Sequence, residues 1–320
     1  MNPHDARVSH DLHALACEVK ALARGLGFDL VGIAPAAPSE RAKFYRQWIA
    51  DGKAGEMSFL ADRIEQRLDP TILLPNARTV VCVAMNYHAN QAGEVATPGD
   101  VRIARYARAD DYHELIKPKL YAIADYVRDA SPGCETRCGV DTAPISEREL
   151  AARAGVGWVG KNTCVINERV GSWIFLGCVL TTLDLPFDTP APDRCGTCTR
   201  CIDACPTSAL TPYQLDAPRC ISYLNIEHAG AIEESLQTKM GDWLFGCDIC
   251  QEVCPWNNRA PSTDLPELQP RFADGRLSID DVLRWQPDDF NRTFRRSAVK
   301  RIRLPQLQRN ARIAAANRGT

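Results

Sequence analysis

The pattern of hydrophobic residues divides the chain into three regions, residues 1–185, 186–261 and 262–320. The first region mixes runs at helical spacing with short apolar runs typical of buried strands, so it predicts an α/β arrangement. The second region is rich in Cys and Pro and has short elements, while the third is helical and basic. In the first region we expect helices at residues 11–24, 39–50 and 111–130, and strands at residues 28–33, 79–84, 163–167 and 173–182, the last two across a turn at residues 168–171.

Local signals at the helix ends refine this prediction. Ser9 is a candidate N-cap for the first helix, the glycines within residues 25–27 end it, and Pro118 is a potential kink in the third. Ser146 and Glu149 match a capping box, which predicts a further helix at this point.

A glycine-rich run follows that helix. Gly155-Val-Gly157-Trp-Val-Gly160 has the spacing G-x-G-x-x-G of dinucleotide-binding loops. Such a loop must follow a strand and open a helix, whereas Gly155 is placed to end a helix. We therefore expect a helix stop here and not a nucleotide site.

The composition is that of an ordinary globular protein. Hydrophobic residues make up 45% and charged residues 24% of the 320 residues, and the formal net charge is -2. No apolar stretch approaches the roughly 18 residues of a membrane span. Residues 1–10 are polar and have neither the apolar run nor the twin arginine of an export signal. We expect a cytoplasmic monomer with no membrane partner.

The cysteines are concentrated in the second region. The chain has 14 cysteines, and eight of them lie between Cys195 and Cys254. Disulfides would require an oxidising compartment and are typical of small secreted chains. In a cytoplasmic protein this concentration indicates metal binding.

The first cysteine run is Cys195-Gly-Thr-Cys198-Thr-Arg-Cys201-Ile-Asp-Ala-Cys205-Pro206. Its spacing, C-x2-C-x2-C-x3-C-P, is that of bacterial ferredoxins. The three closely spaced thiolates can wrap one [4Fe–4S] cluster, while Cys205 points away and binds the other cluster.

The second run, which contains Cys247, Cys250 and Cys254, is incomplete because Leu244 stands where the repeat would have a cysteine. By reciprocity, Cys254 should complete the first cluster, which leaves Cys205, Cys247 and Cys250 with one ligand missing. Cys220 lies in the intervening segment and is the best candidate. Structural zinc is the alternative, but it favours paired C-x2-C knuckles, often with histidine, and fits this spacing badly.

Two short motifs in the first region carry acidic residues. Asp111-Tyr-His113 is similar to the start of the cobalamin-binding pattern D-x-H-x-x-G, but Ile116 stands where that pattern requires glycine. We therefore interpret Asp111 as a helix N-cap and His113 as a surface or packing residue. Asp141 precedes a capped helix, where aspartates usually form caps or turns and less often act as catalytic groups.

The C-terminal segment is strongly basic. Residues 291–320 contain nine Arg or Lys and no Asp or Glu. The charge alone leaves two interpretations equally open, a solvated helical face and contact with nucleic-acid phosphates.

Together, these motifs resemble one family over nearly the whole chain, the epoxyqueuosine reductases, which complete queuosine synthesis in tRNA. The matching strings are Gly27-Phe-Asp-Leu-Val-Gly-Ile33, Gly55-Glu-Met57, Arg67-Leu-Asp-Pro70, Arg105-Tyr-Ala107, Asp111-Tyr-His113, Asp141-Thr-Ala-Pro144, Ala154-Gly-Val-Gly-Trp-Val-Gly-Lys-Asn162, Gly171-Ser172, Cys220-Ile-Ser-Tyr-Leu-Asn-Ile-Glu227 and Gly246-Cys-Asp-Ile-Cys-Gln-Glu-Val-Cys-Pro-Trp-Asn257. The match also supports Cys220 as the fourth ligand of the second cluster.

The resemblance implies a fold, cofactors and site residues. It implies an α+β protein with a cobalamin-binding domain of nitroreductase-like or reductive-dehalogenase-like type at residues 1–185, a ferredoxin-like domain with two [4Fe–4S] clusters at 186–261, and a short helical segment at 262–320. It implies base-off cobalamin, with Asp141 as proton donor. For Asp141 to hold a proton near neutral pH, burial against the corrin would have to raise its pKa. Further implied cobalamin contacts are Arg67, Tyr106, Val165 and Ser222.

The implied reaction is reduction of the epoxide of epoxyqueuosine at the wobble position of a tRNA anticodon. The electrons would come one at a time from a flavodoxin- or ferredoxin-type donor through the clusters. Two alternatives stay open. One is a reductive dehalogenase, which shares these cofactors but usually carries an export signal. The other is an electron-transfer or corrinoid-activating protein with no substrate of its own.

Overall fold

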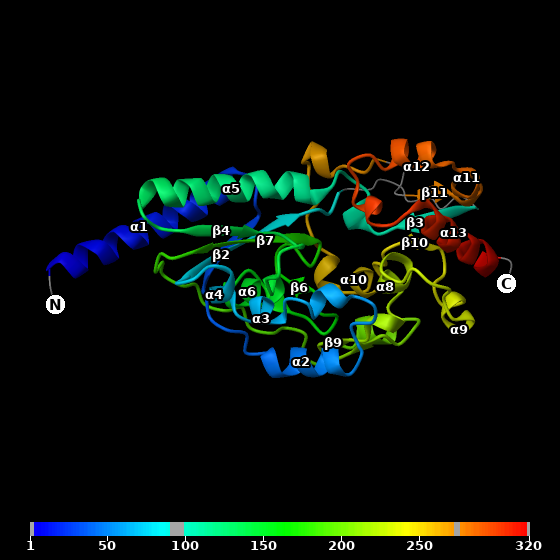
Figure 1. Cartoon of the computed structure of the whole chain (residues 1–320), viewed down its shortest axis with the longest axis horizontal. Helices are drawn as coiled ribbons and strands as arrows, with labels where there is room; N and C mark the ends of the chain where they lie inside the picture. Colours follow the sequence, from blue (N-terminus) through cyan, green and yellow to red (C-terminus); the bar gives the residue numbers. More distant parts are fainter. Residues whose placement is uncertain (1–2, 90–98, 272–275, 319–320) are drawn as a thin grey trace.

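A four-stranded antiparallel sheet with the order β1-β2-β7-β4 forms the framework of the first region. The computed structural model describes residues 3–89, 99–271 and 276–318 (Figure 1). The strands are β1 (Leu30–Pro35), β2 (Thr79–Asn86), β7 (Ile174–Thr181) and β4 (Thr136–Gly139). The two predicted strands at residues 28–33 and 79–84 are confirmed, with ends shifted by two residues.

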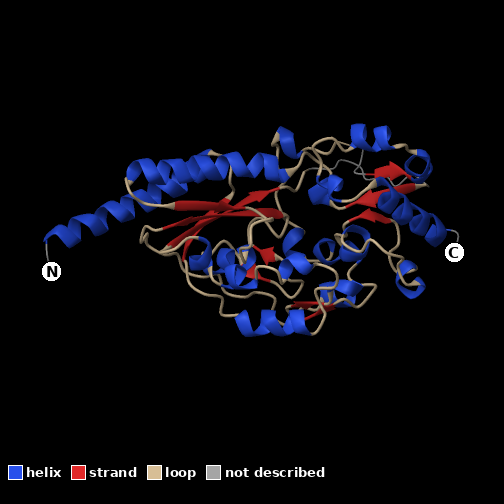
Figure 2. Cartoon of the chain, in the orientation of Figure 1, coloured by secondary structure: helices blue, strands red, loops and turns tan. Residues whose placement is uncertain are grey.

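Helices cover both faces of this sheet (Figure 2). Every residue of β2 is buried, because the strand is central and packs on both sides. Val81, Val83 and Met85 face α1 (Pro3–Gly25) and α5 (Tyr112–Ala130). The alternate residues Val80, Cys82 and Ala84 face α4 (Pro70–Leu73) and α6 (Glu147–Arg153).

The predicted helices are present, but their ends differ in places. Helix α1 begins at Pro3, so Ser9 lies inside it and is not its N-cap. The second predicted helix is α2 (Ala42–Ala50). Helix α5 has Asp111 as its N-cap, as predicted, and continues through Pro118.

The prediction of a capping box at the start of α6 is wrong. The Ser146 hydroxyl donates to the Arg67 carbonyl at 2.9 Å, and Glu149 accepts from Arg153 at 2.7 Å. Both side chains therefore have partners outside the cap. The predicted helix stop is confirmed, because Gly155 has a φ of 71° and its N–H donates to the Ala152 carbonyl.

The two strands predicted around the turn at residues 168–171 do not pair with each other as a hairpin. Strand β6 (Val165–Ile166) pairs with β5 (Trp158–Val159), while β7 joins the main sheet. A single bridge between Asn167 and Gly171 closes the turn. The segment that follows the glycine-rich run is therefore turned away from the main sheet.

A second sheet, with the order β10-β3-β11, takes one strand from each of the three sequence regions. Its strands are β3 (Asp100–Ile103), β10 (Trp243–Phe245) and β11 (Arg276–Ser278). The other elements of the cysteine-rich region are α7 (Arg200–Asp203), β8 (Leu210–Thr211), β9 (Gln214–Leu215), α8 (Ile221–Ile226), α9 (Glu234–Gln237) and α10 (Ile249–Glu252). The remaining short helix α3 (Ile64–Leu68) and the 3-10 turns η1 (Ser58–Leu60), η2 (Arg105–Ala107), η3 (Ala217–Arg219), η4 (Pro255–Asn257), η5 (Pro266–Leu268) and η7 (Ala298–Arg301) lie in connections.

The C-terminal segment packs into this second core and is not a free tail. It forms α11 (Ile279–Arg284), α12 (Pro287–Thr293) and α13 (Leu304–Arg318). Phe294 and Leu307 are fully buried against Phe245 of β10. Among the described helices, none combines the length and the apolar character needed to cross a bilayer.

Gly32 of β1 tests the packing of the sheet against α6. A Cβ added at Gly32 would lie 1.9 Å from the carbonyl oxygen of Ala154, which is backbone and cannot rotate away. We expect Gly32→Ala to lower the free energy of unfolding by at least about 1–3 kcal/mol, the usual cost of overpacking. Thermal denaturation under anaerobic conditions measures this change. Gly25→Ala is the matched control, since a Cβ there meets nothing within 4 Å. Equal stability of the two variants would contradict the packing argument.

Candidate functional site

The eight cysteines of the second region lie at the ends of short elements. Cys195 and Cys198 precede α7, Cys201 lies in it and Cys205 follows it. Cys220 is the N-cap of α8. Of the others, Cys247 and Cys250 flank the start of α10, and Cys254 precedes η4.

The first predicted ligand set comes together at one end of this region. Cys195 and Cys254 pack in one small cluster with Trp158 and Trp256. Burial, together with the nearby Cys195 and Cys201 thiolates, raises the pKa of Cys254 to about 11. Burial also raises the pKa of Cys201, with Cys195 and Cys198 as neighbours. These four thiols therefore share one site.

The second predicted set also comes together. Cys220 and Cys247 pack in one cluster, and burial raises the pKa of Cys247, with Cys220 and Cys205 as its charged neighbours. A hydrogen bond with Cys164 raises the pKa of Cys250, and its other neighbours are Cys247 and Cys220. Cys164 belongs to the first region, so the structure adds a fifth thiol to this set.

The two sets have the donor chemistry that iron–sulfur clusters require. All fourteen cysteines are free thiols, so none is lost to a disulfide. Leu244, where the repeated motif would place a ligand, is instead fully buried among the apolar side chains of the second core. Cys220, a neighbour of Cys247, is a free thiol close to where that ligand would be needed.

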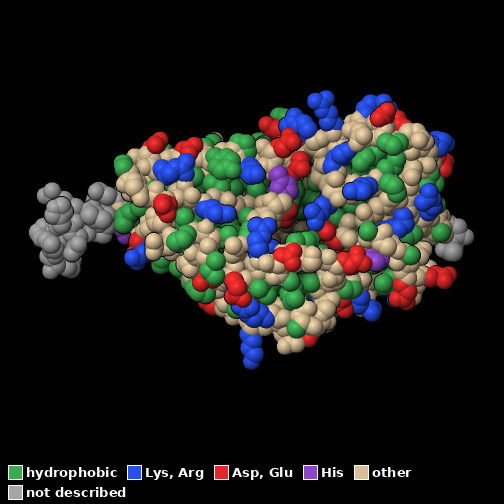
Figure 3. All heavy atoms as spheres, in the orientation of Figure 1, with side chains coloured by type: hydrophobic (Ala, Val, Ile, Leu, Met, Phe, Trp, Pro, Cys, Tyr) green, Lys and Arg blue, Asp and Glu red, His purple; other side chains and the backbone are tan. Residues whose placement is uncertain are grey.

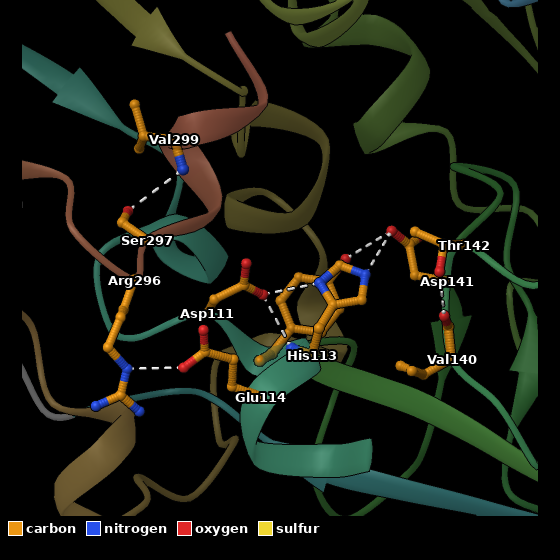
Figure 4. Close-up of polar contacts among 10 residues, drawn as sticks. Asp111, His113, Glu114, Val140, Asp141, Thr142, Arg296, Ser297 and Val299 are labelled. Carbon is orange, nitrogen blue, oxygen red and sulfur yellow. Dashed lines mark hydrogen bonds and ion pairs between the residues drawn. The ribbon is translucent and has the colours of Figure 1, made fainter. Parts of the chain in front are cut away.

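A second group of titratable residues surrounds Asp141, in the loop after β4 (Figure 4). The Tyr112 hydroxyl donates to Asp141 Oδ2 at 2.9 Å. His113 Nε2 lies 3.3 Å from the same oxygen, and its Nδ1 lies 2.8 Å from Asp111 Oδ1. The imidazole ring therefore bridges two carboxylates. It does so because the start of α5 points at the β4 loop.

The charges in this group differ from the expectation. Burial acts to raise the pKa of Asp141, but the ion pair with His113 and the hydrogen bond from Tyr112 outweigh it and hold the pKa below its usual value. In this arrangement the pKa of Asp141 is therefore lowered, and the increase expected from burial against a corrin stays a prediction. The Asp111 and Asp141 carboxylates raise the pKa of His113 to about 9, so the proton is held on the imidazole at neutral pH.

Glu147 of α6 is the third titratable member of the group. Its Oε1 accepts a hydrogen bond from the Asp141 backbone N–H at 2.9 Å. Burial, and then the Asp141 charge, raise the pKa of Glu147 to about 8. At pH 7, Asp141 is therefore ionised, while His113 and Glu147 each carry a proton.

Asp141 lies in a recess of the surface. Its side chain is 59% exposed, yet burial is the largest influence on its pKa, as expected for a group surrounded by protein but open to solvent. Figure 3 shows a hollow near the middle of the molecule with side chains of both charges around it. Arg301 of η7 acts on the pKa of Asp141 from the C-terminal segment. Asp141 is thus influenced by residues of both the first region and the C-terminal segment.

The other predicted cofactor contacts are spread around the same part of the molecule. Burial and the Asp141 charge raise the pKa of Tyr106, so these two residues are neighbours. Arg67 has a buried Nε with no hydrogen-bond partner among the described residues. Val165 is buried in β6, next in sequence to Cys164. Ser222 is half-buried in α8 and lies nearer the second cysteine set, where its backbone N–H donates to Cys220.

Sequence reasoning missed four residues of this site. The sequence suggests a surface or packing role for His113, places Glu147 only within a capping-box pattern, makes Cys164 a poorer ligand candidate than Cys220, and assigns no role to Tyr112. Only the Asp111-Tyr-His113 string carried a local signal. The contact of Tyr112 with Asp141 joins residues 29 positions apart, and the contact of Glu147 with Asp141 depends on how the β4 loop turns back onto α6.

Two family models match the chain. The model for a 4Fe–4S double cluster binding domain matches residues 194–257, and the epoxyqueuosine reductase QueG model (DUF1730) matches residues 67–142. The first covers all eight cysteines, and the second covers Tyr106, His113 and Asp141. The chain therefore contains a double [4Fe–4S] domain.

Related proteins match over nearly the whole length. An epoxyqueuosine reductase from Gloeobacter violaceus is 41% identical over 312 residues, which cover 95% of this chain and 97% of the relative. A crystal structure of epoxyqueuosine reductase with a tRNA-Tyr epoxyqueuosine-modified stem loop is 31% identical with a TM-score of 0.88, covering 96% of this chain and 82% of that one.

A structure from Bacillus subtilis, described with its Asp catalytic loop swung out of the active site, is 30% identical with a TM-score of 0.87, covering 96% and 82% of the two chains. These matches confirm the predicted α+β fold with its ferredoxin-like part. The chain belongs to the epoxyqueuosine reductase family.

Proposed function

We propose that this protein reduces the epoxide of epoxyqueuosine at the wobble position of a tRNA anticodon and so forms queuosine. The observation that carries the proposal is the proton-bearing group around Asp141, which lies in a hollow beside a double [4Fe–4S] domain. Removal of an epoxide oxygen as water consumes two electrons and two protons. The chain has parts suited to supply both.

For the electrons, we assign Cys195, Cys198, Cys201 and Cys254 to the first cluster, and Cys205, Cys220, Cys247 and Cys250 to the second. Bound clusters relay single electrons. Residues 192–194 and 196–197 beside the first set are exposed, so an external flavodoxin- or ferredoxin-type donor can approach there. Cys220 and Cys247 of the second set pack in one cluster with Tyr106, which is a neighbour of Asp141. Electrons would therefore pass from the first cluster to the second and then toward Asp141.

For the reaction at carbon, we propose base-off cobalamin, held by Arg67, Tyr106, Asp141, Val165 and Ser222. When bound, cobalamin supplies the strongly reducing cobalt centre that epoxide chemistry requires. The residues present fit such a group, because Arg67 has a buried Nε with no partner among the described residues and Tyr106 adjoins Asp141.

The protons are held next to where the epoxide oxygen would leave. Asp141 is ionised at neutral pH, so it must receive a proton before it can donate one. His113, whose Nε2 lies 3.3 Å away, can supply it, and Glu147 holds a second. This arrangement of an exposed carboxylate backed by two protonated groups matches the demand for two protons.

The basic C-terminal segment is suited to hold the tRNA beside the hollow. Arg301, which acts on Asp141, belongs to this segment, so phosphates bound there would lie next to the reacting base. Among the described residues, Arg295 and Arg303 are exposed and form no ion pair with an acidic side chain. An unpaired anticodon base is accessible to such a hollow.

Asp141→Asn tests the role of the carboxylate and, with it, the activity. The variant should keep the eight irons of two [4Fe–4S] clusters and its affinity for tRNA, but lose about 10²–10⁴-fold in kcat, because the amide cannot transfer the proton. Queuosine formed anaerobically from epoxyqueuosine-tRNA with added cobalamin measures this.

Two results of that assay would contradict the proposal. Full activity of Asp141→Asn would remove Asp141 from its role. Lack of queuosine formation by the unaltered, iron-loaded protein would favour the alternatives, a dehalogenase-like enzyme or an electron-transfer protein.

The pH dependence of kcat tests the proton supply. Because His113 is protonated below a pKa of about 9 and Glu147 below about 8, kcat should fall as the pH rises through this range. His113→Gln should lower kcat at pH 7 about 100-fold and remove the part of the decline centred near 9. His13→Gln on the exposed face of α1 is the control. Identical profiles for the His113 variant and the unaltered protein would exclude the relay.

Paired substitutions test whether the basic C-terminal segment binds tRNA. They leave the core of the second sheet intact, whereas truncation of the segment would remove part of that core. Arg295→Gln with Arg303→Gln should weaken tRNA binding and flatten its salt dependence by about one unit of log-log slope for each phosphate that is no longer neutralised. Arg24→Gln with Lys43→Gln removes the same charge from α1 and α2, far from α12 and α13 in Figure 1. An equal fall in affinity for both pairs would mean that only overall charge matters.

A further inference from the structure

Residues 161–164, which follow the glycine-rich run, contact both cysteine sets. On one side, Lys161 Nζ donates to the carbonyl oxygens of Gly196 and Cys198, at 2.7 and 3.0 Å. Both acceptors lie in the first cysteine run. The ammonium group is therefore fixed against the loop that wraps the first cluster.

On the other side, the same turn contacts the second set. Asn162 is 4% exposed, and its Nδ2 donates to the Cys250 carbonyl at 3.4 Å while its Oδ1 accepts from the Cys164 N–H at 3.2 Å. Cys164 is thereby held beside Cys250 by contacts to the same side chain. One buried amide thus holds the fifth thiol against a ligand of the second cluster.

The turn itself is tightly constrained. The Gly160 N–H donates to the Cys164 carbonyl at 2.8 Å, and the Thr163 N–H donates to the Gly160 carbonyl at 2.9 Å. Thr163 has a φ of 66°, which a residue with a β-branched side chain rarely adopts. A Cβ at Gly160 would meet the Ile166 side chain at 2.4 Å. The contacts on its two sides are therefore made by one rigid unit.

We propose that residues 161–164 hold the two cysteine loops at a fixed separation and set the reduction potentials of the two clusters, with Lys161 acting on the first and Cys164 on the second. A reduced cluster carries one more negative charge, so a fixed ammonium nearby favours reduction. A hydrogen bond to a ligating sulfur has the same effect. Both are positioning residues, and the inference rests on the ligand sets proposed above.

Single substitutions separate the two contributions. In anaerobic redox titrations of the iron-loaded protein, Lys161→Gln should keep eight irons and lower one of the two midpoint potentials. We expect an about tenfold smaller equilibrium constant for reduction, which is about 59 mV for one electron. Lys161→Arg should restore the potential. Cys164→Ala should lower the other potential, and the double variant should lower both.

Two controls keep the test decisive. Cys17→Ala, on the exposed face of α1, should leave both potentials unchanged. If Lys161→Gln loses iron, the Lys161→Arg variant decides between the two explanations. Full iron content with the native potential in Lys161→Arg supports the role of the charge. Loss of iron in Lys161→Arg as well overturns the inference. Native potentials in both Lys161→Gln and Cys164→Ala would also overturn the inference. Fewer than eight irons in the unaltered protein would instead refute the ligand sets.

Discussion

The pairing of β3 with β10 and β11 is the constraint on which the site depends. These strands come from three distant parts of the chain, and their hydrogen bonds join the three sequence regions in one sheet. The Asp141 loop comes from the sheet, the second cysteine set from the middle region and Arg301 from the C-terminal segment. A chemical site distributed in this way needs a rigid frame more than it needs any single strong contact.

Features with local causes could be predicted from the sequence. The cysteine motif can be recognised from the sequence because cysteines three residues apart can bind one cluster within a single loop. The central strand β2 is readable because burial on both faces leaves an uninterrupted apolar run. The end of α6 at Gly155 is readable because few other residues tolerate the left-handed backbone there.

Features that depend on tertiary partners could not be predicted. Ser146 has the local pattern of a cap, but the Arg67 carbonyl, 79 positions away, takes its hydroxyl instead. The lowered pKa of Asp141 has a similar cause. Burial was foreseen, but the protonated imidazole at the start of α5 was not, and it reverses the sign of the shift. The charge state of a carboxylate depends on its neighbours, and sequence does not state which residues these are.

The interleaved second sheet also bears on the order in which the molecule can be assembled. Phe245 of β10 is covered by Leu307 of α13, and β3 gains its second neighbour only when β11 has been synthesised. During translation, the hollow therefore stays open on one side until almost the whole chain has left the ribosome.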